Sequence, residues 1–99
     1  MSTTQELQHI DRTNVWHPFT QMAEWTQQDQ LIIESGKDNW VIDTEGNRYL
    51  DGISSLWTNV HGHCVPEIDK AVQEQLTKIA HTTMLGLASV PATELAKRL

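Results

Sequence analysis

The sequence predicts an α+β fold: a short N-terminal helix or arm, a three-stranded antiparallel sheet, a loop and two helices. Three β-prone runs, at residues 31–35, 40–43 and 48–51, are separated by four-residue turns rich in Gly, Asn and Asp. That pattern is typical of an antiparallel meander. After a proline at position 66, apolar residues recur at helical spacing, which predicts an amphipathic helix from about 66 to 80.

The first predicted element covers residues 3–14. Leu7 and Ile10 share one helical face, and either Thr3 or Thr4 can cap the start of a helix. A short helix or a frayed arm fits this stretch, since chain termini are often loose unless a partner holds them.

Residues 15–25 contain an unusual density of aromatic side chains. Pro18 disfavours helical backbone at His17, so Trp16 and Phe19 are expected on extended or turning chain. Two interpretations are open. The arm drapes over the core and buries its rings, which we favour, or Phe19 or Trp16 forms a wall of a pocket.

The predicted sheet leads directly into residues 49–63, around which the chain is organised. Gly36 and Gly46 are expected to provide the positive φ angles of the two turns before it. Residues 49–63 combine two glycines with Trp, Ser, Asn and His. Their apolar residues follow neither the helical nor the strand spacing for long. Such backbone is typical of a ligand-facing loop on a rigid base, although a packed connection has the same composition.

Helices are predicted for the end of the chain. In the first of these helices, predicted at about 66–80, the apolar residues that share one face are Ile68, Val72, Leu76, Ile79 and Ala80. A loop follows at 81–89, and Pro91 starts a second helix. We therefore expect four segments: an N-terminal arm at 1–30, the sheet at 31–52, a loop at 53–65 and a helical segment at 66–99.

Composition excludes several classes of partner. The net charge is −6 and no basic run exists, which disfavours nucleic acid and anionic membranes. The single cysteine excludes an internal disulfide and fits a reducing compartment. With no signal peptide and no apolar run of membrane-spanning length, a cytoplasmic location is expected.

A metal site is a weak interpretation of His17, His61, His63 and Cys64. Their spacing fits no structural zinc pattern, so ordinary hydrogen-bonded histidines are expected. Similarly, Asp43, Glu45 and Asp51 lie at turns and strand ends, where carboxylates usually cap backbone N–H groups rather than catalyse.

No catalytic set is recognisable in the sequence. There is no phosphate-binding glycine loop and no nucleophile elbow around Ser54 or Ser55. Only 38% of residues are hydrophobic, and the final helical pattern has no stop signal. We expect the chain to be the N-terminal part of a longer protein and to form the wall of a pocket whose chemistry lies elsewhere.

Three stretches resemble a known family. They are WHPFTQM at 16–22, the D-x-x-G-x-x-Y-L-D pattern at 43–51 with DGISSLW at 51–57, and HTTMLGLASVPA at 81–92. From about residue 12 to 99 the chain resembles the N-terminal segment of class III aminotransferases, which use pyridoxal 5′-phosphate, and most of all their biotin-pathway branch. The resemblance implies the N-terminal part of a fold-type I transferase.

The resemblance also implies an activity. The full-length enzyme would transfer an amino group to 8-amino-7-oxononanoate, with S-adenosylmethionine or lysine as the amino donor. The lysine that binds the cofactor and the main phosphate-binding loop would lie beyond Leu99, so this chain alone would hold no cofactor and would not catalyse.

Site residues follow from the same resemblance. Leu56 and Trp57 match positions that line the substrate site, and Phe19 matches a position often held by a substrate-contacting tyrosine. Phe19 keeps an aromatic face for stacking but lacks the hydroxyl, so the identity of the amino donor stays open. Leu56 also differs from the family pattern, since some members have tryptophan at that position. Gly86 matches a loop that approaches the active site of the other subunit, so a homodimer is implied.

Two alternatives to the biotin-pathway activity remain. One is a class III aminotransferase that acts on another ω-amino substrate. The other is a non-catalytic β-meander module that binds a partner through exposed Trp and Phe side chains.

Overall fold

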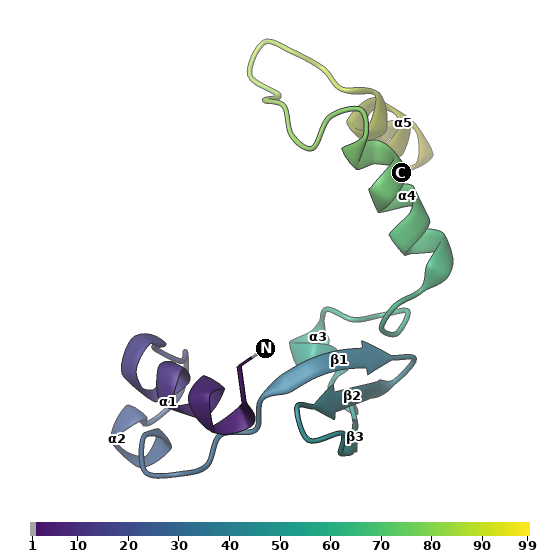
Figure 1. The fold of residues 1–99 in the computed structure, drawn as a ribbon. Helices are drawn as coiled ribbons and strands as arrows, with labels where there is room; N and C mark the ends of the chain where they lie inside the picture. Colours follow the sequence, from purple (N-terminus) through teal and green to yellow (C-terminus); the bar gives the residue numbers. More distant parts are fainter. Residues whose placement is uncertain (1) are drawn as a thin grey trace. The chain divides into compact units, whose positions relative to one another are not determined.

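A computed structural model of the protein describes residues 2–99, which form two compact units that divide after Val65: residues 2–65 and Pro66–Leu99 (Figure 1). The described residues of the first unit hold three short helical elements and a sheet, and the second unit holds two helices. None of the helices in residues 2–99 has both the length and the hydrophobicity that a membrane span requires.

The predicted N-terminal helix is confirmed as α1, Thr4–Asn14. Thr3 caps it: its hydroxyl accepts the N–H of Glu6 at 3.2 Å, while the Glu6 carboxylate accepts the N–H of Thr3 at 2.7 Å. This reciprocal capping box satisfies two N–H groups at the helix start, which explains why a polar segment is helical at all. A second, four-residue helix, α2, covers Met22–Trp25.

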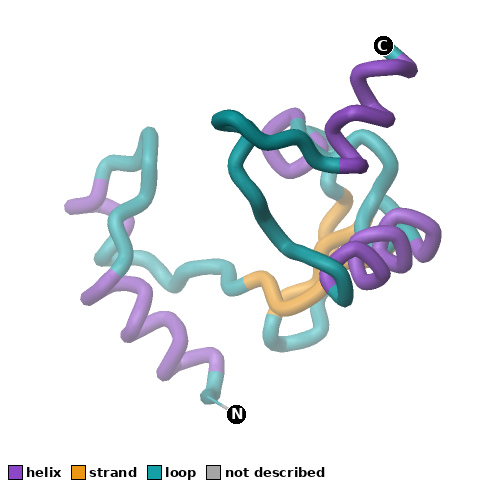
Figure 2. Tube along the Cα trace, turned by 90° about the horizontal axis from the view of Figure 1, so that it is seen from above, coloured by secondary structure: helices purple, strands orange, loops and turns teal. Residues whose placement is uncertain are grey.

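The predicted meander is confirmed as a three-stranded antiparallel sheet, orange in Figure 2. Its strands are β1 (Ile33–Lys37), β2 (Trp40–Asp43) and β3 (Arg48–Leu50), in the order β1-β2-β3. Lys37 pairs with Trp40, so two residues connect β1 to β2, and the register slips at a bulge between Ile33 and Ser35.

The first turn differs from the prediction. Gly46 has φ of 85° as expected, but Gly36 lies inside β1 and the positive φ belongs to Asp38, at 54°. The physical need for glycine at position 36 is a different one. A Cβ built there would lie 2.9 Å from Cγ of His63, so only glycine leaves room for that ring.

The loop predicted at 53–65 contains one compact element, α3, at Ser54–Trp57. In the second unit, α4 covers Pro66–Leu76 and α5 covers Val90–Arg98. The prediction that the first of these helices reaches residue 80 is wrong. After Leu76 the N–H groups of Lys78 and Ile79 both donate to the carbonyl of Gln75 at 3.0 Å, and the regular helix does not continue beyond this turn.

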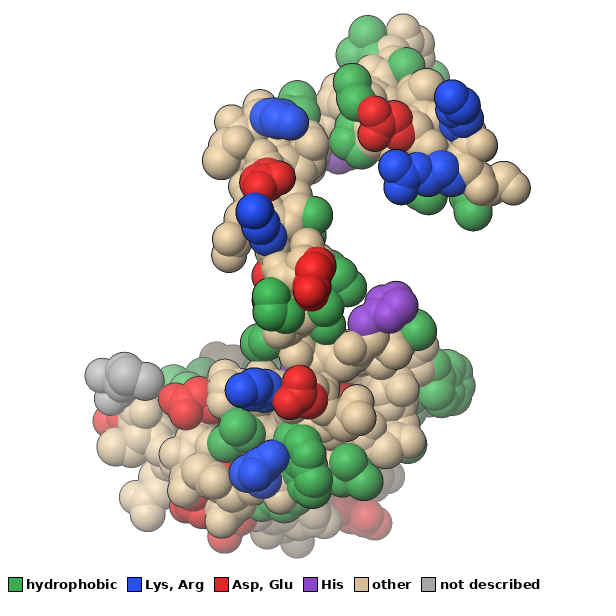
Figure 3. Space-filling model, turned by 90° about the vertical axis from the view of Figure 1, so that its right-hand side faces the viewer, with side chains coloured by type: hydrophobic (Ala, Val, Ile, Leu, Met, Phe, Trp, Pro, Cys, Tyr) green, Lys and Arg blue, Asp and Glu red, His purple; other side chains and the backbone are tan. Residues whose placement is uncertain are grey.

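No hydrophobic side chain in residues 2–99 is fully buried. The buried residues in this part of the chain are polar, Gln30 and Asp43, and many apolar side chains, green in Figure 3, lie at the surface. In α4 the exposed apolar residues are Ile68, Val72 and Leu76. Hydrogen bonds and tight turns, rather than a packed core, therefore define the local structure.

Candidate functional site

The most distinctive backbone of the first unit is α3. Its four residues have φ of 52°, 46°, 64° and 71°, and ψ is 51° at Ser55 and 59° at Leu56. These values describe a left-handed helical turn built entirely from residues with side chains. Such backbone costs about 1–2 kcal/mol per residue and is found mainly where the surrounding structure holds it for a function.

The turn displays two large apolar side chains. Leu56 is 58% exposed and Trp57 is 82% exposed. Two adjacent apolar groups on rigid backbone form a surface against which an aliphatic molecule can lie, because covering them removes apolar area from water. The turn therefore brings together two of the predicted substrate-binding residues.

Asp51 secures this turn. Its Oδ1 accepts the N–H of Ser55 at 2.8 Å, and its Oδ2 accepts the Ser55 hydroxyl at 2.7 Å. Within the turn, the N–H of Trp57 donates to the carbonyl of Ile53 at 2.9 Å. The hydrogen bonds from Ser55 lower the pKa of Asp51, so the carboxylate stays ionised at neutral pH.

His63 connects Asp51 to the first hairpin. Its Nε2 lies 2.8 Å from Oδ2 of Asp51, and its backbone pairs with Asp38 through hydrogen bonds of 2.7 and 3.1 Å. Gly62, with φ of 92°, allows this close approach because a Cβ there would lie 2.9 Å from the carbonyl oxygen of Asp38. The prediction of an ordinary hydrogen-bonded histidine is confirmed for His63.

Asp43 organises the second hairpin. Its Oδ1 accepts the N–H groups of Glu45 and Asn47, and its Oδ2 accepts the Asn47 amide and the Tyr49 hydroxyl, all at 2.8–3.0 Å. Burial by itself would raise the pKa of Asp43, but these hydrogen bonds outweigh burial and the pKa is lowered. The hydrogen bond to Asp43 raises the pKa of the Tyr49 hydroxyl. The predicted capping role is confirmed for Asp43 and for Asp51.

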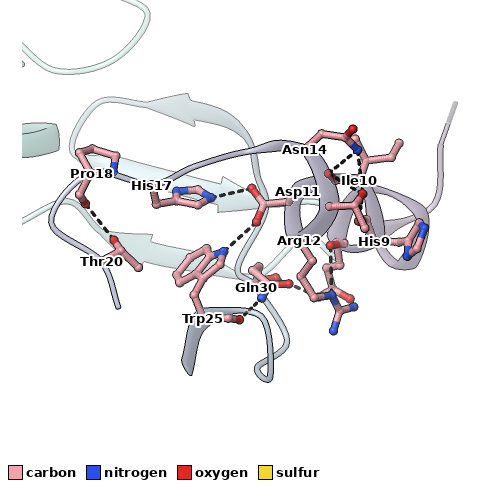
Figure 4. Close-up of polar contacts among 12 residues, drawn as sticks. His9, Ile10, Asp11, Arg12, Asn14, His17, Pro18, Thr20, Trp25 and Gln30 are labelled. Atoms are coloured by element: carbon pink, nitrogen blue, oxygen red, sulfur yellow. Dashed lines mark hydrogen bonds and ion pairs between the residues drawn. The ribbon is translucent and has the colours of Figure 1, made fainter. Parts of the chain in front are cut away.

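A third carboxylate centre was not predicted. Oδ1 of Asp11 lies 2.8 Å from Nε2 of His17, and its Oδ2 accepts the indole N–H of Trp25 at 2.8 Å (Figure 4). The rings of His17 and Trp25 contact each other at a tilt of 44°, with centroids 4.4 Å apart. Desolvation opposes ionisation of Asp11, yet the bonds from Trp25 and His17 lower its pKa. The only sign of this centre in the sequence was that Asp11, a charged residue, shares a helical face with the apolar Leu7 and Ile10.

The arm does not bury its rings as we expected. Trp16 is largely exposed, and Phe19 is fully exposed with φ of 50°. The physical reason is the Asp11 centre, which draws His17 and Trp25 inward and leaves the intervening residues on an outward turn. Phe19 thus shares two properties with Leu56 and Trp57: exposure and left-handed backbone.

Not every predicted site residue lies with this turn. Phe19 comes from a different segment, and Gly86, with φ of 75° and open space around it, belongs to the second unit. A polar cavity of about 600 Å³ between α1 and the β2–β3 turn, lined by Arg12 and Gln30 among others, does not include Phe19, Leu56 or Trp57.

The described residues do not fit a pyridoxal phosphate site. A lysine that forms a Schiff base is usually desolvated, whereas the lysines of this chain are all exposed: Lys37, Lys70, Lys78 and Lys97. In residues 2–99 no group of three or more His, Cys, Asp or Glu side chains is arranged to hold a metal ion. What this chain can contribute is an apolar contact surface.

The sequence profile of the family described as "Aminotransferase class-III" matches residues 21–99. The chain belongs to this family, and the fold is that of the N-terminal part of such an enzyme.

A particular branch stands out among the relatives. The chain is 55% identical, over 98 residues, to the adenosylmethionine-8-amino-7-oxononanoate aminotransferase of Nitratidesulfovibrio vulgaris, covering 99% of this chain and 18% of that protein. The crystal structure of the Methanocaldococcus jannaschii enzyme of the same name superposes with a TM-score of 0.92 at 46% identity, covering 95% of this chain and 22% of that one.

Two further solved structures are similar. An (S)-enantioselective omega-transaminase from Thermomicrobium roseum has a TM-score of 0.90 at 38% identity, over 99% of this chain and 23% of that one. An amine transaminase from an uncultivated Pseudomonas species, in its PLP-bound form, has a TM-score of 0.78 at 32% identity, over 87% and 20%. The chain spans about a fifth of the length of the curated relatives it matches.

Proposed function

We propose that this chain is part of an enzyme that aminates 8-amino-7-oxononanoate to 7,8-diaminononanoate in biotin biosynthesis. The observation that carries the proposal is the 55% identity, over nearly the whole chain, to a relative named for that reaction. The amino donor is S-adenosylmethionine, which that name includes, or lysine. Both substrates are small molecules.

The role we assign to this chain is to provide a substrate wall. Leu56 and Trp57 contact the aliphatic part of the keto substrate, and their burial contributes about 25 cal/mol per Å² of apolar surface covered. Phe19 offers a ring face for stacking on the donor. These contacts orient the substrate and exclude water from it.

The cofactor of the full-length protein is pyridoxal 5′-phosphate, in keeping with the family and with the PLP-bound relative. When bound it supplies the electron sink of amino transfer. In this proposal the groups that hold it lie outside the present residues.

We further propose a cytoplasmic homodimer with neither nucleic acid nor membrane partners, in which the loop at Gly86 approaches the active site of the other subunit. The segments 1–30, 31–52, 53–65 and 66–99 would serve as arm, sheet of the small domain, substrate wall and link to the large domain. The acidic composition and the exposed apolar residues of this loop, Leu85 and Leu87, support these assignments.

Substitution of Trp57 tests the wall. In the full-length enzyme, Trp57→Ala is expected to raise the KM for 8-amino-7-oxononanoate about tenfold or more, because one large apolar contact is lost. The absorbance of the bound cofactor should not change. Val60→Ala, which truncates another exposed apolar side chain of the same loop, is the matched control. Unchanged kinetics for both substrates in Trp57→Ala would contradict the proposed role.

A second candidate is amino transfer to another ω-amino substrate, which the similarity to the omega-transaminase favours. Assay of the full-length enzyme with 8-amino-7-oxononanoate and a panel of ω-amino compounds distinguishes the two. Turnover of 8-amino-7-oxononanoate with S-adenosylmethionine or lysine at the highest kcat/KM supports the first proposal.

A further inference from the structure

We propose that Asp51 is a positioning residue, whose carboxylate holds the left-handed turn at residues 54–57 so that Leu56 and Trp57 face the substrate. This inference deepens the proposed function and rests on the assignment of the two side chains to the substrate wall. In this proposal Asp51 acts through its bonds to Ser55 and not by contact with the substrate.

The turn requires an external anchor. Four consecutive residues with side chains have positive φ, and none of them is glycine, so the intrinsic preference of the backbone is to leave this conformation. Asp51 accepts both the N–H and the hydroxyl of Ser55, at 2.8 and 2.7 Å. One carboxylate thus fixes the second residue of the turn by two bonds to a charged acceptor, which are stronger than neutral ones.

Asp51 is itself fixed to the sheet. Its backbone N–H donates to the carbonyl of Asn39 at 2.8 Å, and its Oδ2 also contacts His63, whose backbone pairs with Asp38. Only 8% of its side chain is exposed. The connection from the β1–β2 hairpin to the turn is therefore short and passes through one charged, largely shielded side chain, which can hold the turn in a fixed position relative to the sheet.

Substitution by asparagine removes the charge while the shape is kept. In the full-length enzyme, Asp51→Asn replaces one acceptor oxygen by an NH2 group and removes the charge, so neither bond from Ser55 keeps a charged acceptor. The KM for 8-amino-7-oxononanoate is expected to rise about tenfold, with the KM for the amino donor changed less and the absorbance of bound cofactor unchanged.

Asp43→Asn is the matched control. Asp43 accepts a comparable set of hydrogen bonds in the same sheet but holds no exposed wall. It should lower the thermal midpoint without a selective change in KM. Equal effects of the two substitutions on KM and thermal midpoint would show Asp51 to be merely structural and would overturn the proposal.

Glycine provides a rescue that a purely structural role does not predict. Ser54 has φ of 52°, and glycine adopts this conformation without a steric penalty. Ser54→Gly added to Asp51→Asn should therefore restore much of the KM, whereas Ser54→Ala should not. Failure of the glycine rescue, or an unchanged KM in Asp51→Asn, argues against positioning.

A structural readout separates this inference from the proposed function. If Trp57→Ala leaves KM unchanged, the substrate wall is wrong, and the anchor can still be measured. Amide hydrogen exchange at Trp57 and Thr58 is expected to be at least tenfold faster in Asp51→Asn than in the parent enzyme. Equal exchange rates would show that Asp51 does not hold the turn.

Discussion

At the scale of single residues, three aspartates do most of the organising in the first unit. Asp11, Asp43 and Asp51 each accept hydrogen bonds from at least two other residues, and each has a lowered pKa. A carboxylate with several donors can satisfy backbone and side chains at once, so it replaces part of what an apolar core would supply.

These lowered pKa values predict acid sensitivity. A carboxylate whose pKa is lower in the folded state stabilises the fold above its unfolded pKa, about 3.9, and loses that contribution as pH falls through the folded value. Asp43→Asn in the full-length protein should therefore be less stable at neutral pH and should lose less stability between pH 5 and pH 3. Urea midpoints measured across this range check the expectation.

Asp29→Asn is the control for that measurement. Its side chain is almost fully exposed and has one ionic contact, to Arg12 at 4.0 Å, so substitution should leave the pH dependence as in the parent. If the urea midpoint of Asp43→Asn changed with pH as much as that of the parent protein, Asp43 would not be a source of acid sensitivity.

Sequence reasoning predicted some of these centres and missed one. Asp43 and Asp51 stand at turns, where local hydrogen bonding to the next few residues is a general tendency. Asp11 has partners six and fourteen positions away across irregular backbone, and no periodicity relates such residues. The same absence of periodicity explains why the exposure of Trp16 and Phe19 was not predicted.

At the scale of elements, the contact between β1 and the residues after α3 is set by a missing side chain. The ring of His63 occupies the space where a Cβ of residue 36 would be. The strand pattern does not show that position 36 requires glycine, because His63 lies 27 positions further along the chain. In the sequence, Gly36 therefore looks like a glycine of the following turn.

Gly36→Ala tests that contact. The added methyl group would overlap His63, and the expected loss of stability in the full-length protein is about 1–3 kcal/mol, as for other overpacked sites. Gly52→Ala is the matched control, because it has open space and no positive φ. Chemical denaturation of both variants gives the comparison, and a harmless Gly36→Ala would mean that His63 moves aside freely.

The left-handed form of α3 could not be predicted from its residues. The segment Ser54–Trp57 has no glycine or asparagine, the residues that usually mark such backbone. Its conformation is anchored by Asp51, which accepts two bonds from Ser55 and in turn contacts His63, twelve positions further along the chain. By contrast, the strands and the start of α4 follow local signals, which is why those elements were predicted within a few residues.

At the scale of the whole molecule, the described residues bury little apolar surface. No hydrophobic residue in residues 2–99 is fully buried, in accord with the low hydrophobic content of the sequence. We expect the isolated 99-residue chain to unfold without a cooperative transition and to bind a hydrophobic dye at neutral pH, because conformational entropy exceeds the gain from burial.

Circular dichroism during heating and dye fluorescence measure this directly. The full-length protein, with its apolar surface covered, is the reference and should show a sharp transition and little dye binding. A sharp transition in the isolated chain, with a midpoint independent of concentration, would show that the hydrogen-bonded centres suffice.

The hydrogen bonds of Asp43 have a consequence for the order of folding. Its partners lie two to six positions away, so the β2–β3 hairpin closes over a very short loop at little entropic cost. Hairpins of this kind form within about 1–10 μs. Residues 40–50 are therefore expected to fold first. The contact between Asp51 and His63 forms afterwards against this hairpin, and α3 takes up its left-handed conformation last.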